Sequence, residues 1–441
     1  MMNPPAIYIP DNAALASVLA GGQGFHPDQA ALVLDFICVK KWMNDLDDAG
    51  FARLNTLVLR QWIQTRALDA IRGHLGEAGV LETAGHSAGR FGTGYRIIPF
   101  YDGPPRRHVI TYPPLVDKLT TWRAAYQASG DGPELAAIIE RRKALLDHQR
   151  DTLAALSLPG TPAEMVAALA GQADAGHVAY VASCIEHGDH VVPRIDGFGW
   201  RLHSLITRTS SRLRPRLLLD GRAVAEVDIG NSQPMLLSIL ANLPHAQHIK
   251  SVRNIMEGLG AGAGSLLFLP AVSPAEAVSF LRCCETGELY SALAEEAERE
   301  SRKTDARAQH MRLNRDRAKV ALFRDVLFGR AYVNGPVTRA FGRRWPSLLE
   351  AIRKLKREHG YKALAQALQR LESYIMLDCV CPRVMCELPG LRFLTIHDSA
   401  MLVADAAEPV KKIMLDEFIK WGVTPTIRIK PAAAATAGKM E

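Results

Sequence analysis

The stretch from residue 224 to residue 240, VAEVDIGNSQPMLLSIL, places a single acid, Asp228, at the end of an apolar run. The residues before Asp228 predict a buried strand, and the apolar residues after Pro234 predict a helix. A carboxylate buried at such a junction is unfavourable unless it is paired or bound to a metal ion. The stretch therefore predicts that Asp228 meets a cation.

A second acid, Asp398, lies in RFLTIHDSAMLV, residues 392–403. The runs FLTI and AMLV predict a β-hairpin with Asp398 at its tip, where it could lie beside the strand that ends at Asp228. Two carboxylates on adjacent strands repel each other unless divalent cations lie between them. Two Mg²⁺ ions bridging such acids can clamp a nucleoside triphosphate and stabilise in-line displacement at phosphorus. Taken alone, however, a buried aspartate more often makes local hydrogen bonds.

A third motif, NRDRAKVALFRDVLFG, covers residues 314–329. Arg315, Lys319 and Phe323 recur at intervals of four and are expected to share one face of a helix. Two cations followed by an aromatic ring suit a triphosphate with a base above it, because the cations neutralise the phosphates and the ring packs near the base. The alternative is a solvated basic helix, which is the commoner fate of a charge run.

Taken in chain order, these three motifs resemble the palm and fingers of family A DNA polymerases and of their single-subunit phage RNA polymerase relatives. The resemblance covers residues 191–431. It implies an α+β fold, a right-hand polymerase palm with a small antiparallel sheet and helical fingers. Four flanking segments add to it, namely GFGWRLHSLITRTSSRLRPRLLLDGRAVAEVD, RRWPSLLEAIRKLKREHGYKAL, ALQRLESYIM and KWGVTPTIRIK.

The resemblance also implies roles for individual residues. Asp228 and Asp398 would bind two Mg²⁺ ions, with Mn²⁺ as an alternative, and the backbone carbonyl of Ile229 would add a ligand. Arg315 and Lys319 would hold the triphosphate while Phe323 lies under the incoming base pair. The primer 3′-hydroxyl would then attack the α-phosphate. Residues expected to face the template and primer are Arg201, His203, Arg212, Arg214, Gln369 and His397.

Three positions depart from the family pattern. Gln233 replaces the glutamate by which the DNA polymerases crowd the sugar 2′-position. A glutamine has similar volume without the charge, which favours deoxynucleotides. Ser399, after the His-Asp pair, is closer to the RNA polymerases. Leu327 replaces an aromatic residue expected four positions after Phe323, so either a one-residue insertion brings Phe328 into place or base-pair checking is looser.

The N-terminal region has helical apolar spacing from Gln29 to about Leu81, read as three helices, followed by two β-rich runs around a Gly/Ser/Arg-rich turn. This order resembles a winged helix-turn-helix, which implies that the helix from about Gln64 to Ala78 enters a DNA groove. The alternative is a purely structural three-helix unit. Arginines cluster on this segment, at Arg60, Arg66, Arg72, Arg90 and Arg96.

The sequence divides into an N-terminal segment (1–28), the winged-helix-like domain (29–112), a helical connector or thumb-like region (113–190), the palm and fingers (191–431) and a flexible tail (432–441). No Asp-x-Glu triplet opens a proofreading exonuclease. The favoured hypothesis is a DNA polymerase without proofreading that replicates a mobile element. The alternatives are an RNA polymerase or primase of the same fold, and a non-catalytic DNA-binding initiator. The segment between Asn242 and Glu300 has no assigned role.

The resemblance implies a DNA template, a primer and nucleoside triphosphates as partners, while the composition indicates only a polyanion. The net charge is +7 and the pI about 9.0, which favours a polyanionic partner over a neutral one, although a merely basic soluble protein would look the same. The seven cysteines lack zinc spacing, and the N-terminus lacks the features of a signal peptide. We therefore expect a cytoplasmic protein with no membrane partner.

Overall fold

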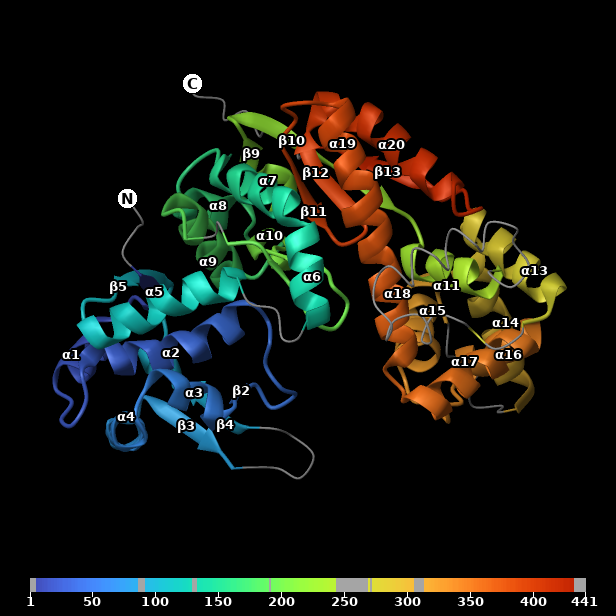
Figure 1. Ribbon diagram of the computed structural model, residues 1–441. Helices are drawn as coiled ribbons and strands as arrows, with labels where there is room; N and C mark the ends of the chain where they lie inside the picture. The colour runs from blue at the N-terminus through green and yellow to red at the C-terminus, as the bar shows by residue number, and fades with distance from the viewer. Residues whose placement is uncertain are drawn as a thin grey trace, which may run out of the picture.

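The computed structural model describes residues 5–85, 92–128, 133–189, 192–242, 269, 272–304 and 313–431 (Figure 1). It mixes many helices with small antiparallel sheets, as an α+β fold requires. Figure 1 shows an N-terminal unit, a central sheet and a helical lobe at the far end. Within the described ranges, no helix combines the length and the apolar character needed to cross a membrane.

The N-terminal unit packs around one core of its own. Its small sheet has the antiparallel order β2-β4-β3, and a separate pair joins β1 to β5. Residues 5–28 therefore share one core with the described residues of 29–112. The elements are β1 (Ala6–Pro10), α1 (Ala13–Ala20), α2 (Pro27–Trp42), β2 (Ala52–Leu54), α3 (Thr56–Trp62), α4 (Thr65–Glu77), β3 (Leu81–Ala84), β4 (Thr93–Ile97), β5 (Pro105–Val109) and α5 (Pro113–Ala128).

The second of the three helices expected in this unit covers FARLNTLVLRQWI, residues 51–63. That expectation is wrong in its first part. Residues Ala52–Leu54 form strand β2, which pairs with β4 in register Ala52 to Tyr95. Asn55 then starts α3, because its side chain accepts a hydrogen bond from the backbone N–H of Leu57. The apolar residues of so short a strand match a helical period equally well, so the sheet contact decides the conformation.

The helices that follow α5 pack against the central sheet. Gln149 on α7 donates from Nε2 to the Phe393 carbonyl (2.9 Å) and accepts from the Thr395 N–H (3.0 Å), so α7 covers the edge strand β11. Helices α8 and α9 contribute to the core under one face of the central sheet. The elements are α6 (Pro133–Arg141), α7 (Lys143–Ala154), β6 (Leu156–Ser157), α8 (Pro162–Ala168) and α9 (Ala175–Glu186).

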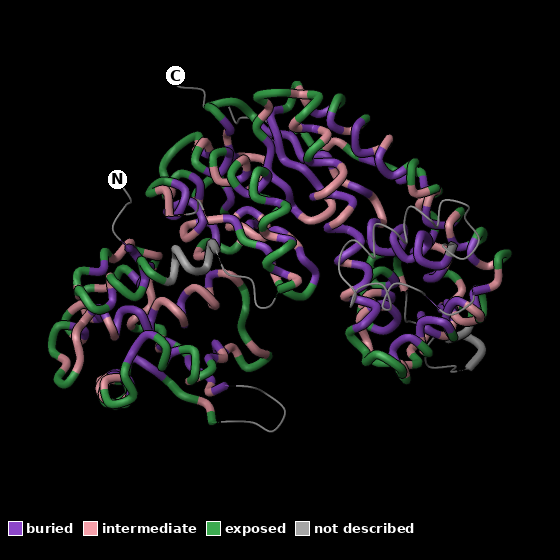
Figure 2. Tube along the Cα trace, viewed as in Figure 1, coloured by how far each residue is buried: buried purple, intermediate pink, exposed green. Residues whose placement is uncertain are grey.

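The central sheet has the order β11-β12-β10-β9-β6, and β13 also pairs with β10. Its side chains alternate between two cores: Val227 and Leu402 face one, while Val224 and Met401 face the other. Figure 2 shows these buried strands running through the middle of the molecule. The elements are β7 (Arg194–Ile195), β8 (Leu202–His203), α10 (Leu205–Arg208), β9 (Leu218–Leu219), β10 (Arg222–Ile229), β11 (Phe393–Ile396), β12 (Ser399–Val403), α20 (Ala407–Ile419) and β13 (Ile427–Lys430).

The helical lobe packs around an aromatic cluster of Phe280, Phe341 and Trp345. From the lobe, α18, η7 and α19 run back to the sheet in one helical path (Figure 1). Two segments, η6 and η7, are π-helical. The elements are α11 (Ser232–Asn242), α13 (Pro274–Glu285), α14 (Leu289–Thr304), α15 (Arg315–Ala321), η6 (Leu322–Leu327), α16 (Pro336–Arg344), α17 (Pro346–His359), α18 (Ala363–Ser373), η7 (Tyr374–Val380) and α19 (Cys381–Glu387).

Candidate active site

The register of the central sheet brings the two acids together. On β10, Asp228 pairs with Ser399 of β12, the residue that follows Asp398. Ile396 pairs with Ser399, so His397 and Asp398 form a two-residue turn, and His397 adopts a left-handed φ of 57°. A non-glycine residue is seldom found in that conformation, so the surrounding structure must hold it there. The turn presents Asp398 beside the end of β10.

The acids share one negative patch. Burial, together with the charges of Glu372 and Asp228, raises the pKa of Asp398 to about 7. Lys430 on β13 pairs with Asp228 Oδ2 at 2.9 Å and with Glu226 Oε1 at 3.0 Å. A group of carboxylates that raises the pKa of Asp398 in this way attracts cations, and Lys430 supplies one positive charge.

The carboxylates of this site suit a Mg²⁺ ion that is bound only in part by the protein. Among the residues that the structure describes, no group of three or more His, Cys, Asp or Glu side chains could hold a metal ion. Mg²⁺ usually binds through one or two carboxylates together with substrate phosphates and waters. Asp228 and Asp398, which the sheet register brings together, are the residues that could hold such an ion.

The predicted cationic helix face lies next to Tyr290. The guanidinium of Arg315 and the Nζ atom of Lys319 lie 5.4 Å and 5.9 Å from the centroid of the Tyr290 ring. The pKa of Tyr290 is raised by burial, and the charge of Asp398 contributes to that rise. Tyr290 is thus near the helix cations and close enough to Asp398 to be affected by its charge. Tyr290 falls in the segment between Asn242 and Glu300, to which the sequence assigned no role. No local pattern in that segment identifies it as a site residue.

The aromatic pair on this helix is explained by a change of helical type. After Ala321 the helix becomes π-helical, and the Phe328 N–H donates to the Phe323 carbonyl five residues earlier (2.9 Å). A π turn accommodates one extra residue. It brings the Phe323 and Phe328 rings to 5.5 Å in an edge-to-face contact. The π turn contains the extra residue that the insertion alternative requires, and the place of Phe328 at the base pair stays a prediction.

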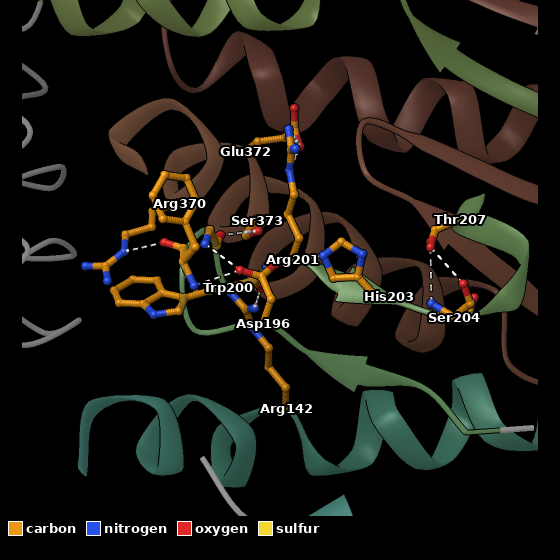
Figure 3. A network of polar contacts seen from close by, with 12 residues as sticks. Arg142, Asp196, Trp200, Arg201, His203, Ser204, Thr207, Arg370, Glu372 and Ser373 are labelled. Atoms are coloured by element: carbon orange, nitrogen blue, oxygen red, sulfur yellow. Dashed lines mark hydrogen bonds and ion pairs between the residues drawn. The ribbon is translucent and has the colours of Figure 1, made fainter. Parts of the chain in front are cut away.

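A buried ion pair ties this region to α18. Arg201 contacts Glu372 Oε1 through Nε (2.8 Å) and Nη2 (2.6 Å), as Figure 3 shows. The other oxygen, Oε2, accepts from Gln233 Nε2 at 2.5 Å and from Ser232 Oγ at 3.3 Å. The sequence analysis did not predict Glu372 as a site residue. Gln369, the residue proposed for this helix, is half-buried beside the backbone of Gly199.

The loop before Arg201 is held by Asp196. Its Oδ1 accepts from the N–H groups of Phe198 (2.8 Å) and Gly199 (2.7 Å), and its Oδ2 accepts from His203 Nε2 (2.8 Å). The His203 ring lies 5.3 Å from the ring of His397. Burial and the nearby Arg201 and His203 lower the pKa of His397 to about 4, so this ring is neutral at pH 7.

Of the other residues predicted to contact nucleic acid, some are exposed and others already bind a side chain of the protein. Arg212 is exposed, whereas Arg214 pairs with Glu226 (3.0 Å). In the N-terminal unit Arg66 is exposed, but Arg72 donates to the Tyr95 hydroxyl. Arg96 pairs with Glu82 (2.6 Å) and lies over the Phe51 ring. Arg90 falls outside the described residues.

Some buried polar atoms without a partner belong to residues of this region. Seven such side-chain atoms occur among the described residues, and three of them belong to residues of this region: Gln233 Oε1, the Tyr290 hydroxyl and His397 Nδ1. Buried polar groups in native proteins nearly always have partners, so a cluster of exceptions indicates a place where a ligand supplies them. A cavity of about 970 Å³ lies elsewhere, beside Trp42 and Pro104 of the N-terminal unit, and contacts none of these residues.

Comparisons with known proteins add little to this geometry. No protein-family model matches the sequence, and no curated protein sequence matches it. Among solved structures, the chain is similar to the POL domain of Pol1 from M. smegmatis, determined in complex with a DNA primer-template and dNTP. The match has 11% identity and a TM-score of 0.28, and covers 94% of this chain and 80% of that chain. A TM-score this low does not establish a shared fold, so any assignment of function depends on the site itself.

Proposed function

We propose that the protein is a template-directed nucleotidyltransferase, a DNA polymerase without proofreading that extends a primer 3′-hydroxyl by phosphoryl transfer. One observation supports this above all others. Asp228 at the end of β10 lies beside the turn that carries Asp398, and Tyr290, whose ring is near the cations of α15, is close enough to Asp398 for that charge to raise its pKa. Opposed carboxylates and cations are what binding a metal-bound triphosphate requires.

Each group then has a role in the reaction. Asp228, Asp398 and the Ile229 carbonyl would hold two Mg²⁺ ions, or Mn²⁺, whose chemistry is charge neutralisation at the reacting phosphate. Arg315 and Lys319 bind the triphosphate and orient it for in-line attack. The 3′-hydroxyl attacks the α-phosphorus and pyrophosphate leaves.

The surrounding side chains position the substrates. The edge-to-face rings of Phe323 and Phe328 pack against the incoming base pair. Gln233, the second residue of α11 and five positions after Asp228, lies beside the sugar. Exposed Arg212 and the loop held by Asp196 contact the primer-template duplex.

Lys319 offers a test of triphosphate binding. Lys319→Ala removes a charge-assisted contact worth about 1.5–3 kcal/mol, so kcat/KM for nucleotide incorporation is expected to fall about ten- to a hundredfold. Arg317→Ala, on the same helix two residues away and so on another face, is the matched control and should leave kcat/KM nearly unchanged. Steady-state extension of a labelled primed template measures both. Equal effects of the two changes would contradict the assignment.

The N-terminal unit is proposed to bind duplex DNA as a winged helix. Its order α2-β2-α3-α4-β3-β4 and its three-stranded sheet support this proposal, and α4 would enter the major groove. The exposed face of α4 carries Arg66 but also Asp69 and Glu77, so any phosphate attraction there is small. Such a unit joined to a polymerase suits the replication of a mobile element.

Fluorescence anisotropy with duplex DNA over a range of salt concentrations tests DNA binding by the N-terminal unit. Arg66→Ala should weaken binding and reduce the slope of log affinity against log salt by about one. An unchanged slope would remove α4 from the interface. Binding with no primer extension by the full chain would instead favour a non-catalytic initiator.

A further inference from the structure

Lys356 on α17 is a buried cation that the proposed reaction does not use. The residue is only 3% exposed, and among the described residues no carboxylate pairs with it. Its Nζ atom instead donates to two backbone carbonyls, those of Val326 (2.6 Å) and Gly329 (2.8 Å). Burial lowers the pKa of Lys356 to about 8, because an ammonium group is costly to keep away from water. The two hydrogen bonds offset that cost, so the role of Lys356 is to be sought at the carbonyls that it binds.

The two carbonyls lie on either side of Phe328. The π-helical segment η6 ends just before Phe328, so the Val326 carbonyl is among those for which a helix provides no N–H donor of its own. At Gly329 the chain turns back against the helix, and a Cβ atom there would collide with the Arg324 carbonyl oxygen. A cation is also favourable at the carbonyl end of a helix. Lys356 therefore fixes the backbone on both sides of Phe328.

The backbone of Phe328 also closes the π turn. Its N–H donates to the Phe323 carbonyl (2.9 Å), and the two rings lie 5.5 Å apart in an edge-to-face contact. Because π turns are rare, a helix seldom adopts one without support from its surroundings. A return to α-helical spacing would turn Phe328 about 100° around the helix axis and separate the rings. Lys356, which comes from another helix, provides the support that prevents this.

We infer that Lys356 is a positioning residue, which holds the carbonyls beside Phe328 and thereby keeps the ring pair of Phe323 and Phe328 where the incoming base pair packs against it. The inference rests on the proposed function, in which that ring pair contacts the base pair. Lys356 itself is buried and contacts no substrate. Its loss should therefore weaken the binding and selection of the matched nucleotide, while the acids and the cations of α15 that serve the reaction stay in place.

Steady-state extension of a primed template by Lys356→Met tests this role, because methionine is similar in length and has no donor. We expect the KM for the matched nucleotide to rise about tenfold and the preference for matched over mismatched nucleotides to fall about tenfold, with kcat changed by less than about threefold. Lys356→Arg retains a cation with donors and should restore most of the KM. Lys354→Met, which alters an exposed lysine on the same helix, is the matched control and should change neither quantity.

A second measurement needs no catalysis. Fluorine NMR of the protein with para-fluorophenylalanine in place of Phe328 reports the surroundings of that ring. The resonance should shift or broaden in Lys356→Met and stay in place in Lys354→Met. A resonance unmoved by Lys356→Met means that the lysine does not hold the ring, which overturns the inference. If Lys356→Met fails to fold, Lys356→Gln, which keeps an amide donor on a shorter side chain, replaces it in both measurements with the same criteria.

The kinetic outcomes are distinct as well. A loss of kcat and of stability, with KM and nucleotide preference unchanged, means that Lys356 is merely structural and overturns the inference. A ring that moves without a change in KM or preference overturns it too, because the ring pair would then not contact the base pair. Wild-type protein that incorporates no nucleotide contradicts the proposed function, and the inference falls with it. Equal incorporation and equal preference in the wild type and Lys356→Met contradict the inference alone.

Discussion

Replacing Asp398 with asparagine is expected to lower the rate of primer extension about a thousandfold or more while leaving the protein folded. The change removes one of the two carboxylates that would hold the catalytic metal ions, and such ions contribute several kcal/mol of transition-state stabilisation. In metal-free buffer the variant is expected to be at least as stable as the wild type. The reason is that Asp398 lies against Asp228 and Glu372, which together with burial raise its pKa to about 7.

Opposite changes in activity and stability separate a catalytic role from a structural one. A merely structural acid would lower both when replaced. Single-nucleotide extension in Mg²⁺ measures the first, and the melting temperature in EDTA measures the second. Near wild-type extension by Asp398→Asn would contradict the role given to this acid. Asp405→Asn, which alters an exposed acid beyond β12, is the matched control and should change extension little.

The second large effect is expected on stability, from Arg142. This side chain is almost fully buried. It contacts Asp378 through Nε (2.9 Å) and Nη2 (2.6 Å) and donates from Nη1 to the Trp200 carbonyl (2.6 Å). It joins α7 to η7 and to the loop that precedes Arg201, as Figure 3 shows in part. Breaking a buried ion pair by removing one partner costs about 3–5 kcal/mol, because the other charge stays buried.

Arg142→Met should therefore lower the free energy of unfolding by about 3–5 kcal/mol in urea denaturation. Arg150→Met is the matched control, because Arg150 lies on the same helix in an exposed pair with Asp147 and should cost under about 1 kcal/mol. Replacing Asp378 by leucine in the Arg142→Met background should recover part of the loss, since no buried charge then lacks its main partner. A loss as small as that of the control would mean that this pair does not hold the connector in place.

Local pattern was enough to predict the elements that carry the two acids. The runs FLTI and AMLV gave the hairpin, with the observed β12 one residue longer, and the apolar run before Asp228 gave the strand β10. Both depend on alternation and turns within a few residues. The meeting of Asp228 with Asp398 was a hypothesis from the two strand ends, to which the resemblance added, because sheet register over such a separation is not encoded locally.

The residues missed are those whose role depends on distant partners. Glu372 is one turn from Gln369 on α18, and only its contacts with Arg201 and Gln233 single it out. Tyr290 is identified by the two cations of another helix that lie over its ring. The π turn before Phe328 cannot be predicted from a uniform helical period of 3.6 residues per turn. Such features arise from tertiary packing rather than from sequence periodicity.

The most direct measurement is the binding of Mn²⁺, by electron paramagnetic resonance, to the protein with a dideoxy-terminated primed DNA and the matching nucleotide. The wild type is expected to bind two ions beyond those held by nucleotide and DNA alone, and Asp228→Asn to lose at least one of them. Identical Mn²⁺ binding by the wild type and Asp228→Asn would contradict the claim that these two acids share metal ions with a triphosphate.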